Sequence, residues 1–139
     1  MSMTRRSILA ALGFCVAMGA AAPVFAAENA PQTFTEDAFE AAQRAGKPIL
    51  IDTYATWCDV CARQAPILEK LRSEPKFKDL VTFKVNFDTQ KDVMRRFNAR
   101  VQSTLIAYRG TKEVGRSVGE TQPEWIDDLV EKTLLNRTS

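Results

Sequence analysis

The sequence predicts a single three-layer α/β domain, in which helices flank a central mixed sheet of about four strands. Strand-like runs alternate with helix-like segments along residues 33–136, and the last two strand-like runs follow each other across a short turn that contains glycine. Strands separated by helices form parallel pairs with right-handed crossovers, whereas strands joined by a short turn pair antiparallel. Residues 27–32 precede this pattern, show no periodicity and are expected to form a flexible leader.

The N-terminal segment, residues 1–26, has the features of a signal peptide. Arg5 and Arg6 precede a short apolar run, and Val24–Ala26 form a small-residue cleavage site of the A-x-A type. The paired arginines also resemble a twin-arginine export signal, although such pairs occur in ordinary signal peptides too. The apolar run is shorter than the ~20 residues of a bilayer span. We therefore expect export to the periplasm, cleavage near Ala26 and no stable membrane insertion.

This segment carries the excess charge of the chain. Arg5 and Arg6 are two of the 19 basic residues, whereas all 17 acidic residues follow the segment, so the mature chain is close to neutral. Nucleic acid is not an expected partner, because no basic stripe remains to bind phosphates. Of the three cysteines, Cys15 lies in the removed segment. The remaining Cys58 and Cys61 cannot form a multi-bridge scaffold, so this pair is available for chemistry.

The first expected helix begins after Thr35, which has the side chain of an N-cap residue. Phe34 and Phe39 stand at the two positions of a hydrophobic staple across that start. Gly46 is expected to end the helix, because glycine adopts the left-handed conformation found just after helix ends. The apolar run of residues 49–54 follows as a buried strand.

The second expected helix begins near Cys58 and ends before Pro75, with a kink at Pro66. Residues 80–87 alternate between apolar and polar side chains, which predicts a second strand.

A third helix is expected to run from an N-cap at Asp88 or Thr89 to about Asn98. Residues 104–108 and 113–118 are expected to be two strands of a hairpin, because the residues between them include glycine.

The last expected helix starts at a capping box formed by residues 121–124, Thr-Gln-Pro-Glu. We expect it to bury Trp125 and Leu129 in the core.

Cys58 and Cys61 follow directly after the predicted strand 49–54. Side chains three residues apart on a helix have Cβ atoms ~5–6 Å apart, so these cysteines can form a reversible disulfide with little backbone movement. The free N–H groups and the dipole at a helix N-terminus favour a thiolate at Cys58. We therefore expect Cys58 to attack a partner disulfide, and Cys61, one turn deeper, to resolve the mixed disulfide. This chemistry needs no cofactor.

The stretch from Asp52 to Cys61, followed by Pro66, resembles thioredoxins and the thioredoxin-like domains of periplasmic, Dsb-type proteins that handle disulfides. The resemblance covers residues 34–135 and implies the thioredoxin fold. It also implies that Asp52 lies buried beneath the cysteines and exchanges protons with Cys61, and that Lys84 neighbours this acid. The physical reason is that a buried carboxyl group has a raised pKa and so acts as a base near neutral pH.

Two features modify the pattern that the resemblance implies. Asp59 and Val60 stand between the cysteines, and the charge of Asp59 opposes a thiolate beside it. Since the chain has no histidine to stabilise the thiolate instead, we expect a reducing character. Ser103 stands where the family has a cis-proline that guides extended substrates. A cis bond before serine costs ~2.5–4 kcal/mol, so the Gln102–Ser103 bond is expected to be trans.

The expected substrate contacts lie around the cysteines: Trp57, Asp59, Val60, Ser103 and Thr104. Trp57 suits this role because it is a large aromatic residue beside Cys58. The expected partners are protein disulfides and a thiol electron donor, for which a membrane reductase is one candidate. The protein is expected to be a monomer.

The expected function is that of an exported thiol-disulfide oxidoreductase, which reduces protein disulfides or relays electrons in the periplasm. A Dsb-type oxidase or isomerase is the alternative within the same chemistry. Two alternatives belong to another class: a metal-binding module, in which two copies of the chain each supply a C-x-x-C pair, and a binding module in which the disulfide is redox-inert. No metal site is expected within one copy, because the mature chain has no further cysteine and no histidine.

Overall fold

The computed structural model describes residues 29–135, so the predicted signal peptide lies outside the described residues. A mixed sheet of five strands, in the order β1-β3-β2-β4-β5, forms its centre. The strands are β1 (Gln32–Thr33), β2 (Pro48–Tyr54), β3 (Val81–Asn86), β4 (Thr104–Arg109) and β5 (Lys112–Val118). The helices are α1 (Glu36–Arg44), α2 (Asp59–Ser73), α3 (Lys91–Arg96) and α4 (Pro123–Glu131), with a 3₁₀ turn, η1, at Pro75–Phe77. Within residues 29–135, no helix has the length and apolar character to cross a membrane.

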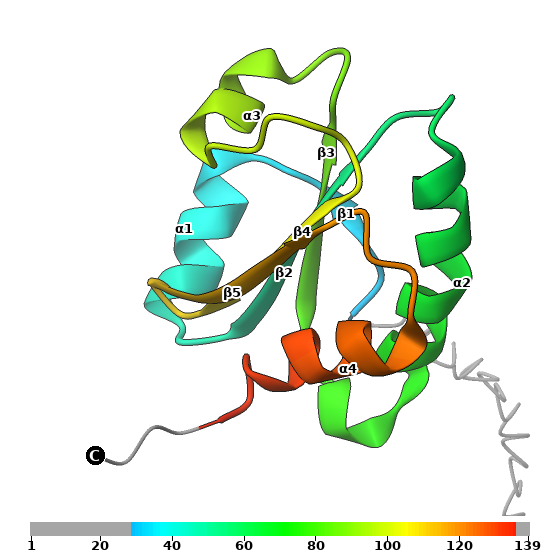
Figure 1. Ribbon diagram of the computed structural model, residues 1–139. Helices are drawn as coiled ribbons and strands as arrows, with labels where there is room; N and C mark the ends of the chain where they lie inside the picture. Colours follow the sequence, from blue (N-terminus) through cyan, green and yellow to red (C-terminus); the bar gives the residue numbers. More distant parts are fainter. Residues whose placement is uncertain (1–28, 136–139) are drawn as a thin grey trace, which may run out of the picture.

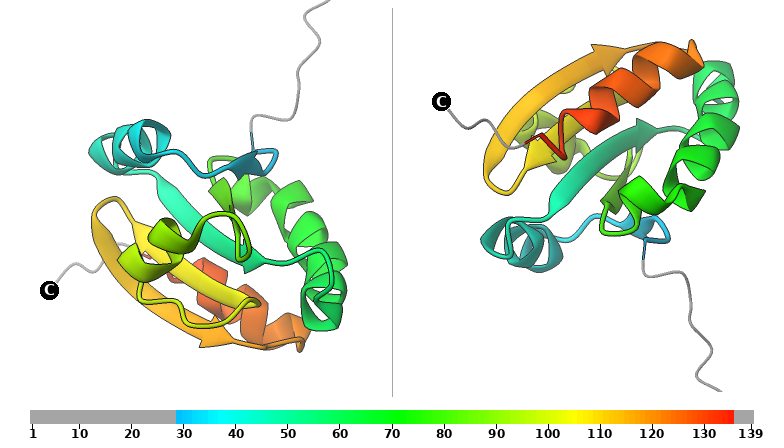
Figure 2. Two further views of the ribbon diagram at one scale, coloured as in Figure 1. Left: turned by 90° about the horizontal axis from the view of Figure 1, so that it is seen from above. Right: turned by 90° about the horizontal axis from the view of Figure 1, so that it is seen from below.

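The sheet combines parallel and antiparallel pairs, as predicted. β3 pairs in parallel with β1 and β2, whereas β4 pairs antiparallel with β2 and β5. Helices α1 and α3 cover one face, and α2 and α4 cover the other (Figures 1 and 2). The three-layer α/β prediction is therefore confirmed.

The sheet has one strand more than expected, because the end of the predicted leader pairs with it. Gln32 and Thr33 lie in register with Phe83 and Lys84 of β3. A strand of only two residues has no periodicity that the sequence alone can reveal.

The start of α1 follows its local sequence signals. Thr35 Oγ1 accepts a hydrogen bond from the Ala38 N–H at 3.4 Å, so Thr35 is the N-cap. The rings of Phe34 and Phe39 meet across it, with centroids 5.5 Å apart. Gly46 follows the helix with a φ of +66°, as expected for a residue that ends a helix. The predicted cap, staple and stop are confirmed.

Successive residues of β2 face opposite sides of the sheet. Ile49 and Ile51 pack beneath α1 and α3, whereas Leu50 packs with Leu68 of α2. This alternation places Asp52 on the same face as Leu50, at the end of β2 that leads into α2. The face beneath α2 thus ends in a carboxyl group.

The face beneath α1 and α3 is filled with rings. Five of its buried or half-buried aromatic residues form a network of tilted and edge-to-face contacts, which we call the aromatic cluster: Phe34, Phe39, Phe83, Phe97 and Tyr108. Phe39 alone contacts each of the other four rings, with centroids between 5.3 and 5.9 Å away.

The predicted caps of α3 are wrong. Asp88 and Thr89 both donate their backbone N–H groups to Asn86 Oδ1, at 2.8 and 3.2 Å, and so form a turn instead of a helix start. Gln90 is the N-cap residue. The helix is shorter than expected because the asparagine side chain competes for the N–H groups that the helix would use.

The start of α4 also differs from its prediction. Gln122 is the N-cap residue, and no side-chain bond closes the predicted capping box. Glu120 Oε1 instead accepts hydrogen bonds from the N–H groups of the next two residues. The helix buries Ile126 and Leu129, whereas Trp125 is 63% exposed. The prediction that Trp125 is buried is therefore wrong. Its neighbour Ile126, and not Trp125, shares the inner face of the helix with Leu129.

Candidate active site

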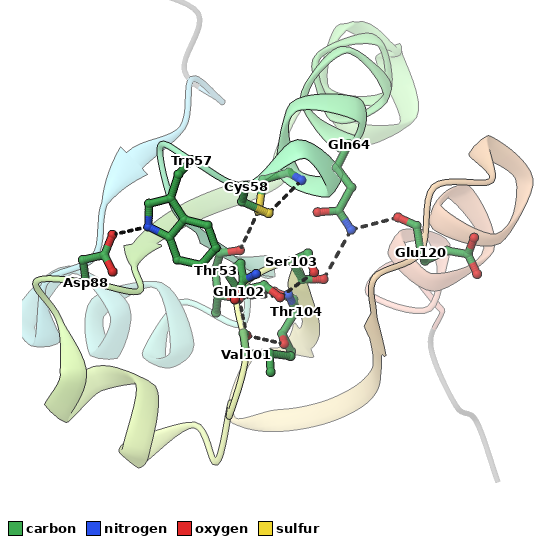
Figure 3. Close-up of a disulfide and its surroundings, with 11 residues drawn as sticks. Thr53, Trp57, Cys58, Gln64, Asp88, Val101, Gln102, Ser103, Thr104 and Glu120 are labelled. Carbon is green, nitrogen blue, oxygen red and sulfur yellow. Dashed lines mark hydrogen bonds between the residues drawn. A yellow bond between two sulfur atoms is a disulfide. The ribbon is translucent and has the colours of Figure 1, made fainter.

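The two cysteines lie at the N-terminus of α2, directly after β2. Cys58 is the N-cap residue and forms a disulfide with Cys61, with Cα atoms 5.3 Å apart. The Cys61 N–H donates a hydrogen bond to Cys58 Sγ at 3.1 Å, so a sulfur takes the place of the usual capping oxygen (Figure 3). The predicted pairing and helix start are confirmed. The same donor would stabilise a thiolate at Cys58 after reduction.

The burial of the two cysteine residues reverses one expectation. Cys58 is 6% exposed, whereas Cys61 is half-buried, so Cys61 does not lie deeper. α2 runs along the face of the sheet, and one turn along such a helix is not a step towards the core (Figure 1). The assignment of Cys58 as the nucleophile therefore depends on its N-cap position and not on exposure.

Asp52 and Lys84 lie side by side next to the disulfide. Their Cα atoms are partners in the β2–β3 register, and Asp52 is only 8% exposed. Burial raises the pKa of Asp52 above its usual value, and the positive charges of Lys84 and Arg72 oppose that rise. Lys84 Nζ also lies 4.2 Å from the centre of the Tyr54 ring, which holds it beside β2.

A cavity joins this carboxyl group to the cysteines. It has a volume of about 190 Å³, and its lining includes Asp52, Lys84, Cys58 and Cys61. A space of this size admits solvent, since one water occupies roughly 30 Å³ in the liquid. Asp52 thus has a route for proton transfer to the sulfurs.

The side chains expected to meet substrate on the α2 side lie at the surface. Trp57 is 58% exposed, its ring packs edge-on against Phe87, and its Nε1–H donates to Asp88 Oδ2 at 2.9 Å. These two contacts fix the indole beside Cys58 (Figure 3). Asp59 is exposed in the first turn of α2, and Val60 is half-buried.

The other expected contacts, Ser103 and Thr104, are buried. Ser103 donates its N–H to the Thr53 carbonyl at 2.8 Å, and its own carbonyl accepts from the Gly119 N–H at 3.0 Å. Thr104 donates its N–H to Thr53 Oγ1 at 2.9 Å. These hydrogen bonds connect the loop of residues 101–104 to β2 and to the end of β5. Val101, at the start of this loop, is 43% exposed.

The Gln102–Ser103 bond is trans, as predicted, since residues 29–135 contain no cis peptide bond. Ser103 has a φ of +62°, in the left-handed region that a residue other than glycine rarely adopts. The loop that faces the cysteines therefore differs in shape from a loop built on a cis-proline.

Two residues of this site were missing from the sequence-based prediction. Thr53 is fully buried, and its carbonyl oxygen lies 2.8 Å from the Ser103 nitrogen and 3.9 Å from Cys61 Sγ. Gln64 is 1% exposed and donates through Nε2 to the carbonyls of Ser103, at 3.3 Å, and Glu120, at 2.8 Å. The available signal was a glutamine three residues after Cys61, at a position where a helix lying on a sheet buries apolar side chains.

Comparisons with known proteins agree with this geometry. Residues 30–132 match the thioredoxin family model. A thioredoxin of Coprinus comatus is 33% identical over 98 residues, which cover 70% of this chain and 92% of that protein. A thioredoxin of Alicyclobacillus acidocaldarius is 30% identical with the same coverage. The crystal structure of Trxlp from Edwardsiella tarda EIB202 is 47% identical, with a TM-score of 0.70, and the match covers 72% of this chain and 97% of that one.

The fold, the position of the disulfide and these similarities agree with one another. The five-stranded sheet places a C-x-x-C disulfide at the N-terminus of α2, and the family match spans the described domain from β1 to the end of α4. The chain therefore belongs to the thioredoxin family and is a thiol-disulfide oxidoreductase.

Proposed function

We propose that the protein is an exported reductase of protein disulfides, which a thiol electron donor returns to its dithiol form. The observation that carries the exchange chemistry of this proposal is the position of Cys58 as the N-cap of α2, with its sulfur accepting a hydrogen bond from the Cys61 N–H. After reduction, this donor and the helix dipole favour a thiolate at Cys58.

The first step is attack by the Cys58 thiolate on one sulfur of a substrate disulfide. A new bond forms between Cys58 Sγ and that sulfur, the substrate S–S bond breaks, and the second substrate sulfur leaves as a thiolate that takes up a proton. The exposed Trp57 beside Cys58 offers an aromatic surface to the incoming polypeptide.

The second step releases the substrate. Cys61 loses its proton to the Asp52 carboxylate through the cavity that both residues line. Its thiolate then attacks Cys58 Sγ, which re-forms the Cys58–Cys61 disulfide and expels the remaining substrate sulfur as a thiolate that takes up a proton. Two electrons have moved from the protein to the substrate, and a thiol donor restores them. Burial raises the pKa of Asp52, which makes its carboxylate a stronger base than an exposed one.

The direction of electron flow follows from Asp59. This charge stands in the first turn of α2, directly after Cys58 in the sequence, and a negative charge there weakens the stabilisation of the thiolate. The chain has no histidine that would restore it. A less stable thiolate shifts the equilibrium towards the disulfide and makes the dithiol a better reductant.

Export is supported by the signal-like segment of residues 1–26, and the periplasm is the proposed compartment. There, a membrane reductase is the proposed electron donor and disulfide-bonded proteins are the proposed substrates. Cell fractionation tests the location: the protein should be recovered with soluble periplasmic markers, shortened near Ala26.

Equilibration with glutathione buffers tests the reductase function. We expect a reduction potential below about −180 mV, whereas a higher value would assign an oxidase or isomerase instead. Asp59→Asn should move the potential towards less negative values. An unchanged potential in this variant would contradict the role given to Asp59.

A further inference from the structure

We propose that Gln64 is a positioning residue, whose amide sets the shape of the loop of residues 101–104 next to the disulfide. The inference rests on the proposed function and on the sequence-based expectation that this loop meets the substrate polypeptide. Gln64 would thereby act on substrate binding and not on the exchange of electrons.

Gln64 connects three segments that are far apart in the sequence. It projects from α2, one turn after Cys61, and its Nε2 donates to the carbonyls of Ser103 and Glu120, at 3.3 and 2.8 Å (Figure 3). Both acceptors are backbone carbonyls, so the amide nitrogen and not its oxygen must face them. Glu120 lies between β5 and α4, so this one side chain connects α2, the loop and the start of α4.

The loop needs such support because its backbone is strained. Ser103 has a φ of +62°, a conformation that crowds the side chain of any residue except glycine. A proline at this position would fix φ near −65° through its ring. Since Ser103 has neither the ring nor that φ, its conformation depends on hydrogen bonds from its neighbours. Thr53 holds its N–H, and Gln64 and Gly119 hold its carbonyl.

The same bonds determine where the loop lies relative to the cysteines. The Thr53 carbonyl oxygen is 2.8 Å from the Ser103 nitrogen and 3.9 Å from Cys61 Sγ. Release of the Ser103 carbonyl from Gln64 would loosen the loop on the side of α2, while the contact of Thr53 with Cys61 would persist. The shape of the binding surface and the chemistry of the disulfide are therefore separable.

Fold stability alone does not explain a glutamine at this position. Gln64 is 1% exposed, and its Oε1 has no hydrogen-bond partner among residues 29–135. An unpartnered amide oxygen in the interior is unfavourable, and an apolar side chain of similar size would avoid it. Polar groups that are retained against local stability are characteristic of functional sites.

The decisive variant is Gln64→Met, which keeps the side-chain length and a good helix propensity but removes the donor. We expect the KM for a disulfide-bonded protein substrate to rise about fivefold, the factor that corresponds to the loss of one net hydrogen bond. The kcat, the glutathione potential and the rate with a small aromatic disulfide should stay unchanged. Equal KM values for Gln64→Met and the wild type would overturn the proposal.

The matched control is Thr133→Val. Thr133 is also 1% exposed, and its Oγ1 donates to the Val130 carbonyl at 2.6 Å, just after α4. This variant loses a buried hydrogen bond away from the cysteines, so it should be less stable without any change in KM. A similar rise in KM for both variants would show a general effect of destabilisation and would refute positioning by Gln64.

Gln64→Glu adds a pH signature that a purely steric role would not produce. An ionised carboxylate cannot donate to the two carbonyls, whereas a protonated carboxyl group donates one hydrogen bond. The KM of this variant should fall towards the wild-type value as the pH is lowered, while the KM ratio of Gln64→Met to wild type stays constant. The absence of this difference would contradict the donor role.

Amide hydrogen exchange provides a readout that does not depend on catalysis. In Gln64→Met, the Ser103 and Gly119 amides should exchange about fivefold faster, whereas the Phe83 amide of β3 should not change. If the wild type reduces no protein disulfide, the proposed function fails, and exchange still decides whether Gln64 holds the loop. Faster exchange with an unchanged KM would make Gln64 only structural and would overturn the positioning role.

Discussion

The sheet packs against rings beneath α1, whereas at the N-terminus of α2 it packs against polar side chains. The aromatic cluster on the first side joins five rings through tilted and edge-to-face contacts. The region around the N-terminus of α2 holds most of the buried polar residues of the described domain, which we call the polar cluster: Asp52, Thr53, Gln64, Ser103 and Thr104. The two clusters lie on one sheet, and β4 contributes to both, through Tyr108 and Thr104.

The comparison separates what stabilises the fold from what adapts it to its chemistry. Aromatic pairs add about 0.5–1.5 kcal/mol each beyond the area they bury. The polar cluster contains groups that favour folding less, such as a carboxyl group whose pKa is raised by burial and an amide oxygen without a partner in residues 29–135. We therefore expect substitutions in the first cluster to change stability and those in the second to change activity.

The largest expected effect on stability is that of Phe39→Ala. Phe39 is 2% exposed and contacts every other ring of the aromatic cluster. Its truncation should lower the free energy of unfolding by about 3–5 kcal/mol, as measured by urea denaturation. The glutathione potential of the folded variant should equal that of the wild type. Phe39→Leu serves as the control and should lose less, and a shifted potential in either variant would break the separation of the two clusters.

Asp52→Asn, in the polar cluster, should lower the activity and raise the stability of the protein. In the proposed mechanism Asp52 is the base that accepts the proton of Cys61, so the rate of disulfide reduction near pH 7 should fall by about a hundredfold. The free energy of unfolding near pH 7 should rise, because a buried charge is replaced by a neutral side chain of the same shape. Stopped-flow kinetics and urea denaturation measure the two quantities. A simultaneous loss of rate and stability would contradict the division of roles.

The pH dependence of stability tests the same residue. The folded-state pKa of Asp52 lies above its ordinary value of 3.8, so the native state binds this proton more tightly than the unfolded state does. The contribution is fully favourable below the ordinary value of 3.8 and is lost as the pH rises through the folded-state pKa. Asp52→Asn should remove this decline. Parallel stability profiles of the variant and the wild type would show that Asp52 titrates normally.

Trp57→Phe should have the smallest effect on stability. It keeps a ring against Phe87 but loses the hydrogen bond to Asp88 at the surface, so the free energy of unfolding should fall by less than about 1 kcal/mol. The KM for a protein substrate should rise, because the indole offers the larger contact area beside Cys58. Trp125→Phe is the matched control, since Trp125 is also exposed but lies on α4. Equal KM values in the two variants would remove Trp57 from the binding surface.

Features governed by neighbouring residues could be predicted from the sequence. The N-cap at Thr35 and the helix start at Cys58 depend on side chains within one turn, and both are confirmed. The alternation in β2 likewise assigns each residue to one face of the sheet. The wrong prediction for Trp125 also has a local cause. Trp125 and Ile126 are adjacent in α4, and an error of one residue in choosing the inner face of the helix exchanges one for the other.

Features governed by distant partners could not be predicted in this way. The pairing of Gln32 with Phe83 makes a strand of two residues that has no signal of its own. The bonds of Gln64 reach residues 39 and 56 positions away, so only the folded chain reveals them. The positive φ of Ser103 follows from the same contacts, although the sequence did predict its trans bond.

Trapping of the mixed disulfide tests the central claim most directly. In chains that also carry Cys15→Ser, each remaining cysteine is replaced by serine in turn and the reduced protein is mixed with a disulfide-bonded protein. Cys61→Ser should accumulate a covalent complex through Cys58, which dithiothreitol cleaves, because no resolving thiol remains. Cys58→Ser should form no such complex and should reduce no substrate. A complex formed by Cys58→Ser but not by Cys61→Ser would contradict the assignment of Cys58 as the attacking cysteine.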